Sequence, residues 1–407
     1  MSIAEPTAAA LPAMASVDAL SLRSRRGRVM LGTLTAAHFA HHTSNSLLNP
    51  LLPLIRDTFA LSYAQAGFAV SAFGLSVGLA NGPMGILADR IGSRRVIVAG
   101  LVIGAATSVA LGLTADYAQL LVMLLALGLV SGTYHGPAAA IIARVFSSRV
   151  RGAAMGFHIT GGHLSFFAAP LVAAWLATLT GTWRTAYVGF AIIPVLCAIA
   201  LWRIAPDDRP SRHVGDLLAP FREIRNVLGV IGPLVSLSLV FQIGLASVNA
   251  FLALYLVDAR GVSPVVAAAA FGFTQLAGVV GAPLGGTLSD RLGRKTLIVA
   301  SLGAVGPLVW LLTLVPNELV LVPLGLIGIA VSTRSVATEV LVMDSAAPER
   351  RASVLGAYYL ASQPIGGIAA PFFGLAAGAF GIAATFSGVA IGLVGLSAFT
   401  VILGRRL

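Results

Sequence analysis

Charged residues and cysteine are scarce in this chain of 407 residues. Only 10% of its residues are Asp, Glu, Lys or Arg, and Cys197 is the single cysteine. One cysteine excludes an intramolecular disulfide and a cysteine-built metal centre. The sequence also lacks a G-x-x-x-x-G-K-S/T pattern, which argues against ATP hydrolysis by this chain. No set of nucleophile, base and acid emerges from the polar segments, so we expect neither an enzyme nor a cofactor.

Apolar residues dominate instead, at 57% of the chain with a mean hydropathy of +0.92. Runs of about 20 apolar residues, enough for a helix to cross the hydrocarbon layer, recur throughout. The predicted spans are 29–54, 65–88, 96–114, 119–143, 152–179, 185–202, 227–257, 264–288, 296–315, 319–343, 352–379 and 382–403. The sequence therefore predicts an all-α membrane protein with twelve transmembrane helices. Its predicted parts are an N-terminal tail (1–28), a six-helix half (29–203), a central loop (204–226) and a second six-helix half (227–404).

The basic residues are distributed unevenly along these spans. All but four of the 26 Lys and Arg residues fall on one side; the exceptions are Arg56, Arg184 and Arg260 on the other side and Arg334 inside a span. By the positive-inside rule, this places both termini and the central loop in the cytoplasm of a bacterial-type inner membrane. The net charge of +11 then records topology, and no nucleic-acid partner is expected. Residues 1–28 lack an apolar core followed by a cleavage site, so they are predicted to be a tail and not a signal peptide.

One segment of the chain is written twice. GILADRIGSRR at Gly85–Arg95 recurs as GTLSDRLGRK at Gly286–Lys295, each copy lying between two apolar runs. The offset between Asp89 and Asp290 is close to half the chain. The sequence therefore predicts two pseudo-symmetric halves, a plan known from transporters that bind substrate between their halves.

The repeated pattern G-x-L-x-D-R-x-G-x-R/K resembles the signature loop of the major facilitator superfamily. That resemblance implies alternating access by rocking of the halves, with the loops acting as a conformational latch. The latch residues are Gly85, Asp89, Arg90, Gly92, Arg95, Gly286, Asp290, Arg291, Gly293 and Arg294. We expect Gly85 and Gly286 to permit close helix approach, and the aspartates to meet a helix N-terminus or an arginine. The alternative is that the arginines are only topology signals.

Ionisable groups inside a membrane are costly and therefore mark functional candidates. Six of the seven histidines fall in spans of the first half, and nearby polar residues join them in a predicted substrate site. Its members there are His38, His41, His42, Asn45, Tyr134, His135, His158 and His163. Three interpretations stay open: histidines hydrogen-bonded in packing, histidines that carry protons or contact substrate, and a transition-metal site of His38, His42 and a partner. No metal site is assigned on this basis.

The second half contributes a different chemistry. Arg334 lies inside a span and is a candidate counter-ion for an anionic substrate, because guanidinium binds carboxylate or phosphonate through two parallel hydrogen bonds. Glu339 is the candidate for proton coupling, together with His42. Gln242, Tyr358 and Gln363 complete the predicted substrate site. Alternatively, Arg334 has a structural role and pairs with a distant acid or a helix carbonyl, and Glu339 merely neutralises an arginine or a histidine.

The first half also carries a narrower likeness. Tyr134–Pro137 and the glycine-rich segment Arg151–Gly162 are similar to the fosmidomycin-resistance exporters. This implies a secondary transporter that exports a small polar, anionic organic solute or drug in a proton-coupled manner. Proton-coupled uptake of a small metabolite and histidine-based transport of a metal or metal chelate remain as alternatives. The expected partners are a small-molecule substrate, protons and the lipid bilayer, and a monomer is expected.

Overall fold

The computed structural model describes residues 20–207, 219–344, 358, 362 and 364–404. Within them the regular secondary structure is helical, apart from one isolated bridge between Leu20 and Phe146. Ten helical segments of the described residues are long and apolar enough to cross a membrane, some of them formed by two consecutive helices, and Gly367–Phe380 is a shorter apolar helix. The predicted all-α membrane fold is confirmed.

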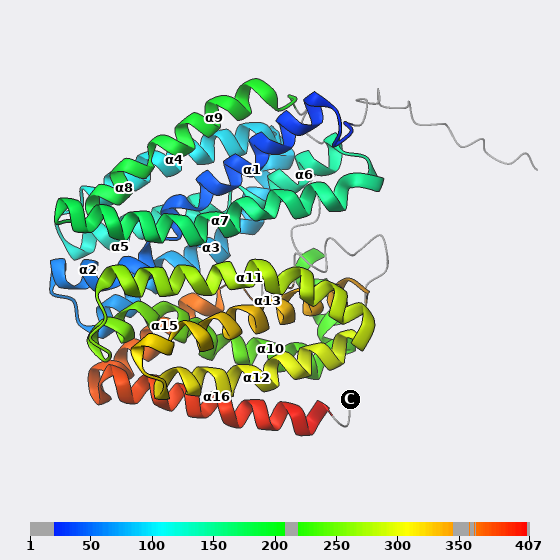
Figure 1. The fold of residues 1–407 in the computed structure, drawn as a ribbon. Helices are drawn as coiled ribbons and strands as arrows, with labels where there is room; N and C mark the ends of the chain where they lie inside the picture. Colours follow the sequence, from blue (N-terminus) through cyan, green and yellow to red (C-terminus); the bar gives the residue numbers. More distant parts are fainter. Residues whose placement is uncertain (1–19, 208–218, 345–357, 359–361, 363, 405–407) are drawn as a thin grey trace, which may run out of the picture.

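Two groups of helices follow one another along the chain (Figure 1). The first group contains α1 (Arg25–Asn45), α2 (Leu48–Phe59), α3 (Tyr63–Ile91), α4 (Ser93–Gly112), α5 (Tyr117–Ser131), α6 (His135–Val145), α7 (Ser148–Thr180), α8 (Arg184–Phe190) and α9 (Ile192–Ile204). The second contains α10 (Ala219–Asp258), α11 (Pro264–Leu292), α12 (Arg294–Leu314), the 3-10 helix η1 (Asn317–Leu319), α13 (Leu321–Asp344), α15 (Ile365–Phe380) and α16 (Ile382–Gly404). α10 begins at Ala219, inside the stretch predicted to be the central loop. The eleventh predicted span is 352–379, and most of its part that precedes α15 lies outside the described residues.

Prolines divide three of the predicted spans of the first half. The expected first span, 29–54, is two helices, and so are the fourth and the sixth, with breaks before Pro50, Pro137 and Pro194. Proline has no N–H and its ring clashes with the carbonyl four residues earlier, so a helix is interrupted just before it. Two of these breaks lie next to the histidines, since α1 ends at Asn45, soon after His42, and α6 begins at His135.

The repeated segment has the same architecture in both copies. α3 and α11 are each 29 residues long, and each is capped at its N-terminus by a serine, Ser62 or Ser263, that accepts from a backbone N–H. Each ends at a glycine with positive φ, 97° at Gly92 and 86° at Gly293. Only glycine adopts this backbone without strain, which explains why both copies keep it between two helices.

Contacts between the two groups connect α3 with α15 and α7 with α11. They gather at the end of the molecule opposite to the start of α1 and the end of α16 (Figure 1). A Cβ at Gly67 would lie 2.5 Å from the carbonyl oxygen of Ala370, and one at Gly374 would collide with the Tyr63 carbonyl. Small residues thus let the helices of the two groups touch along their backbones.

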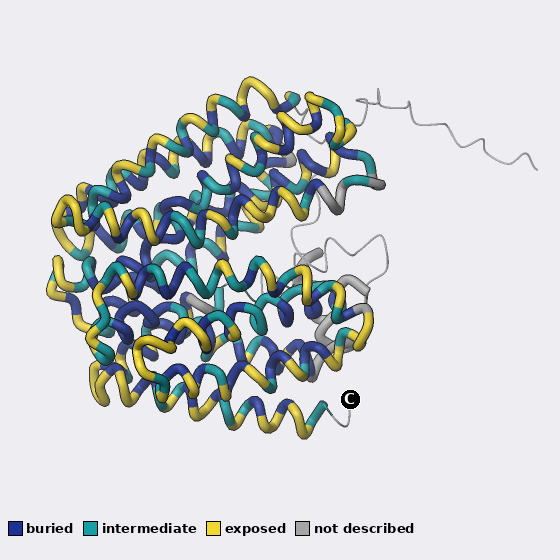
Figure 2. Tube along the Cα trace, in the orientation of Figure 1, coloured by how far each residue is buried: buried dark blue, intermediate teal, exposed yellow. Residues whose placement is uncertain are grey.

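Large apolar side chains cover the outside of the helices. Leu79, Trp175 and Phe380 are 66%, 57% and 76% exposed, and Figure 2 shows exposed positions running along α9 and α16. Such a surface is unsuited to water and suits lipid tails. The chain is a multi-pass membrane protein.

Candidate functional site

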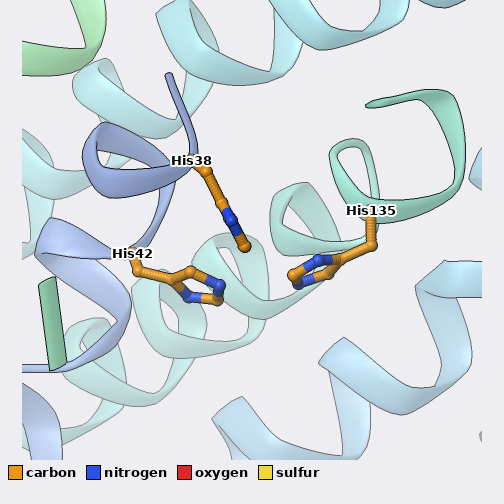
Figure 3. Close-up of side chains that lie close together, drawn as sticks. All are labelled: His38, His42 and His135. Carbon is orange, nitrogen blue, oxygen red and sulfur yellow. The ribbon is translucent and has the colours of Figure 1, made fainter. Parts of the chain in front are cut away.

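Three imidazoles from two helices converge in the first half. His38 and His42 lie one turn apart on α1, and His135 is the first residue of α6. One ring nitrogen from each lies within 4.8 Å of the others. Figure 3 shows the three rings pointing toward a common space. The i, i+4 spacing on α1 and the break before α6 together produce this arrangement.

His38 is fixed on three sides. Its ring packs against those of Tyr134, with centroids 5.2 Å apart, and His158, at 4.4 Å, and these two rings also lie 5.8 Å from each other. Its Nδ1 lies 3.0 Å from the backbone carbonyl oxygen of His158 on α7. A carbonyl only accepts, so Nδ1 carries the proton of the neutral ring and Nε2 carries a lone pair. That Nε2 is buried and has no hydrogen-bond partner among the described residues.

Space for these rings comes from a glycine on the neighbouring helix. A Cβ at Gly162 of α7 would lie 2.8 Å from Cε1 of His38 and 3.2 Å from Cδ2 of His42. Any side chain here would push both rings away. The glycine-rich part of α7 therefore shapes the histidine cluster.

The other predicted residues of the first half lie around this cluster. His41 stacks on Tyr134 at 4.7 Å, and it lines a small pocket together with Asn45, against α4 and α5. His163 is within electrostatic reach of His38 and His42. Tyr134 is 1% exposed, and its hydroxyl donates to the carbonyl oxygen of Leu34 at 2.8 Å. The structure thus brings the predicted histidines together, and Asn45 lines a small pocket that it shares with His41.

The second half holds a charged group inside its helices. Arg334 on α13 is 4% exposed and donates to Oε1 of Gln242 on α10 at 3.2 Å. The guanidinium also interacts with the Tyr358 hydroxyl and with the carboxylate of Glu339. Its Nε has no hydrogen-bond partner among the described residues. Four predicted residues therefore form one group; Gln363 lies outside the described residues.

The repeated loops differ in part from the expectation. The side chains of Asp89 and Asp290 lie outside what the structure describes. A Cβ at Gly85 or Gly286 would meet no described atom within 4 Å. The close helix approach expected at these two glycines is thus not seen among the described residues, and it stays a prediction. On α11 the close approach occurs earlier, at Gly281, where a Cβ would lie 2.7 Å from the Ile329 carbonyl oxygen.

The arginines of the loops face different surroundings. Arg90 and Arg291 are exposed, and Arg294 is half-buried. Arg95 lies 3.7 Å from a carboxylate oxygen of Asp207, in a pairing that also includes Arg94 at 2.9 Å. Asp207 follows α9 in the first half, so this contact lies within one half and does not bridge the two.

A contact between the halves escaped the sequence analysis. Arg56 on α2 donates to both carboxylate oxygens of Asp258 at the end of α10, and Tyr63 donates to the same group at 2.7 Å. Burial disfavours the charge of Arg56, but hydrogen bonds to Asp258 and Asp57 outweigh it and raise its pKa above the ordinary value. The sequence feature that could have drawn attention to Arg56 is that it is one of only three basic residues on this side of the predicted spans.

The two other arginines on this side cap helix ends. Arg184 donates to the Gly112 and Thr114 carbonyls at the end of α4, and Arg260 donates to the Leu312 and Val315 carbonyls at the end of α12. Guanidinium groups satisfy the last carbonyls of a helix, which have no partner within it. These exceptions to the charge asymmetry therefore have structural reasons.

Comparison with known proteins identifies the family. The profile of the Major Facilitator Superfamily matches residues 34–371. The chain is 25% identical over 373 residues to the fosmidomycin resistance protein of Escherichia coli, covering 89% of this chain and 90% of that protein. It is 30% identical over 275 residues to a probable 4-methylmuconolactone transporter of Cupriavidus pinatubonensis, covering 65% and 62%. A bacterial homolog of the human lysosomal transporter Spinster, solved in an inward-facing and occupied conformation, has the same fold, with a TM-score of 0.77 at 19% identity and coverage of 94% and 97%. The chain belongs to the Major Facilitator Superfamily and is a membrane transporter, not an enzyme.

Proposed function

We propose that this transporter exports a small anionic organic compound in exchange for protons. The buried guanidinium of Arg334 carries the proposal, because a cation in this position suits an anionic solute and its Nε has no hydrogen-bond partner among the described residues. Gln242 orients the guanidinium through the 3.2 Å bond. A carboxylate or phosphonate then binds through two parallel hydrogen bonds.

Export is supported by the relative named for fosmidomycin resistance, which is similar along 90% of its length. Exchange for protons requires that solute and proton compete for one group. The imidazoles of His38 and His42 suit this role, because an imidazole lone pair accepts either a proton or a hydrogen bond from the solute. His163 and His158 extend this set of acceptors.

Proton-coupled uptake is the second candidate, and one observation favours it. Glu339 interacts electrostatically with Arg334. An ionised Glu339 competes with an anionic solute for the guanidinium, so protonation of Glu339 promotes solute binding and favours movement of both in one direction. The relative named as a probable 4-methylmuconolactone transporter is consistent with carriage of a small metabolite.

We further propose that the repeated loops act as the latch of the opposite conformation. The described contacts between the halves lie at the end that holds Arg56 and Asp258. If the basic side of the protein is cytoplasmic, this conformation is open to the cytoplasm, and closure there would bring the two loops together. Asp89→Asn should then impair transport at unchanged expression, and full activity would exclude the latch. A C-terminal reporter active only outside the cytoplasm should remain silent.

The transport test uses fosmidomycin and inside-out vesicles that contain the protein. With a gradient that is acidic inside, accumulation above empty vesicles is the expected result for export by exchange. Accumulation in right-side-out vesicles with an acidic exterior would instead establish uptake with protons. In either case Glu339→Gln separates the roles, since loss of the dependence on the gradient at retained solute binding assigns the coupling to Glu339. No accumulation in either vesicle, with folded protein, would reject fosmidomycin as a substrate.

A further inference from the structure

We infer that His38, His42 and His135 form a binding site for a divalent transition-metal ion of the zinc type. The inference rests on the convergence of three imidazoles. A bound ion would use the lone pairs of His38 and His42 that the proposed exchange offers to a proton, so the ion and the proton would compete for them. One nitrogen from each ring lies within 4.8 Å of the other two. Three histidines with an open fourth position are a common ligand set for Zn²⁺.

The distances are close to those of a bound site. Zn–N bonds of about 2.0–2.1 Å in tetrahedral geometry place the ligand nitrogens about 3.4 Å apart. The rings would therefore have to close by on the order of 1 Å, which small side-chain rotations supply for His42 and His135. His38 needs to move least, because its ring packs against those of Tyr134 and His158 and its Nδ1 donates to the His158 carbonyl oxygen.

The protonation pattern of His38 is that of a metal ligand. Its Nδ1 donates to the backbone carbonyl of His158 at 3.0 Å, so Nε2 presents a lone pair. A carbonyl that orients the second ring nitrogen is the usual outer partner of a metal-binding histidine. Nε2 of His38 and Nδ1 of His42 are both buried without a hydrogen-bond partner among the described residues. Ring stacking explains the orientation of these rings but leaves the two buried nitrogens unsatisfied, which a metal ion would correct.

Access and ion type follow from the surroundings. His38 is buried, His42 is half-buried and His135 is exposed, so an ion can enter past His135. The absence of a side chain at Gly162 keeps the space between His38 and His42 open. An all-imidazole set favours Zn²⁺, Ni²⁺, Co²⁺ or Cu²⁺ over Mg²⁺ and Ca²⁺, which prefer oxygen ligands. Neutral ligands leave the charge of the ion uncompensated, so the fourth position suits water or an anionic oxygen.

The experiment titrates the purified full chain, carrying an affinity tag without histidine, with Co²⁺ and then with Zn²⁺. We expect one Co²⁺ per chain with the visible absorption of a four-coordinate ion, and displacement of that signal by Zn²⁺. Zn²⁺ affinity is measured by competition with a chromophoric chelator. His42→Gln and His135→Gln should each weaken it by at least the roughly 10–100-fold that loss of an outer partner costs. Both variants keep a polar side chain of similar size, and His38→Gln is the third test.

His213→Ala is the matched control, because His213 is the one histidine outside the predicted spans. It should bind Co²⁺ and Zn²⁺ as the parent does. Thermal unfolding of each variant without metal establishes that it is folded. Failure of the folded parent to bind Co²⁺ saturably would overturn the inference, and so would unchanged affinity in the His42→Gln, His135→Gln double variant. Mg²⁺ should produce no stabilisation at the same concentration.

Discussion

Arg334 is a charged residue that is both buried and hydrogen-bonded. Lysine at this position would keep the positive charge but lose the planar fork that bonds Gln242 and an anionic group together. A hydrogen bond to a charged group contributes about 1.5–3 kcal/mol, so we expect Arg334→Lys to raise the KM for an anionic solute about 10–100-fold. Transport into vesicles at varied solute concentration measures this. Arg26→Lys, at an exposed position before the first predicted span, is the control and should leave KM unchanged.

Tyr134 was predicted to contact substrate, and its surroundings suggest a packing role. Its ring lies against His38 and His41, and its hydroxyl donates to the Leu34 carbonyl at 2.8 Å. Tyr134→Phe should lower stability by about 1 kcal/mol, the contribution of one hydrogen bond. Thermal unfolding of the purified protein tests the loss, and KM should stay within about twofold. A large increase in KM at unchanged stability would return Tyr134 to the substrate site.

The rarity of ionisable residues in apolar spans was enough to find the candidate residues. It selected the histidines of α1, α6 and α7 and the group around Arg334, and the structure brings each set together. Sequence could not give the ring nitrogen of His38 that carries a proton, because that depends on how α7 packs on α1. Nor could it pair Arg56 with Asp258, since a contact between residues 202 positions apart depends on the arrangement of both halves.

Among the helical elements, α2 and α10 carry the ion pair that connects the halves. Arg56 and Asp258 are only 17% and 14% exposed, so solvent weakens their interaction less than at an open surface. Because the pKa of Arg56 is raised from an already high value, its charge persists across the physiological pH range and high pH does not break the pair. Asp258→Asn should shift the equilibrium toward separation at this end by about 10-fold or more, as expected for a charged hydrogen bond.

Cysteine labelling measures that shift. Cys197→Ala removes the chain's single cysteine, and Ser71→Cys places a thiol at a buried position of α3. A membrane-impermeant maleimide should react faster when Asp258→Asn is added. Asp57→Asn is the matched control, because Asp57 also bonds Arg56 but is 63% exposed, and it should change the rate less than about twofold. Equal rates in both variants would argue against a gate at this pair.

The seam between α3 and α15 depends on glycine. A Cβ at Gly67 would lie 2.5 Å from the Ala370 carbonyl oxygen, whereas one at Gly82 of the same helix would meet no atom of the described residues within 4 Å. Gly67→Ala should destabilise the contact between the halves by about 1–3 kcal/mol, the usual cost of overpacking. Gly82→Ala should leave it unchanged. The maleimide labelling rate of the Ser71→Cys background measures the effect of both variants. Similar rates for the two variants would contradict the claim that the contact between α3 and α15 requires glycine at position 67.

For the molecule as a whole, duplication was the most informative feature of the sequence. The repeat predicted two related halves, and α3 and α11 share their length, serine caps and terminal glycines. Hydropathy predicted the spans but not their interruptions, because an apolar count does not register the missing N–H of a proline. The direction in which the halves are open was also beyond the sequence, since the same chain must adopt both states.

The proline breaks have a consequence for how the two halves respond to strain. Positions 200 residues after Pro50, Pro137 and Pro194 are occupied by Ala250, Ala337 and Val394, and the helices there run on without interruption. These three helices are thus interrupted in the first half, whereas the matched helices of the second half are continuous. Deuterium should enter the amides beside each helix break sooner than the amides at the matched positions of the second half, because helices open locally where their backbone hydrogen bonds are interrupted. Equal deuterium uptake would mean that the helix breaks are as rigid as the continuous helices. Faster uptake would identify the histidine-bearing half as the more flexible of the two and the second half as the more rigid one.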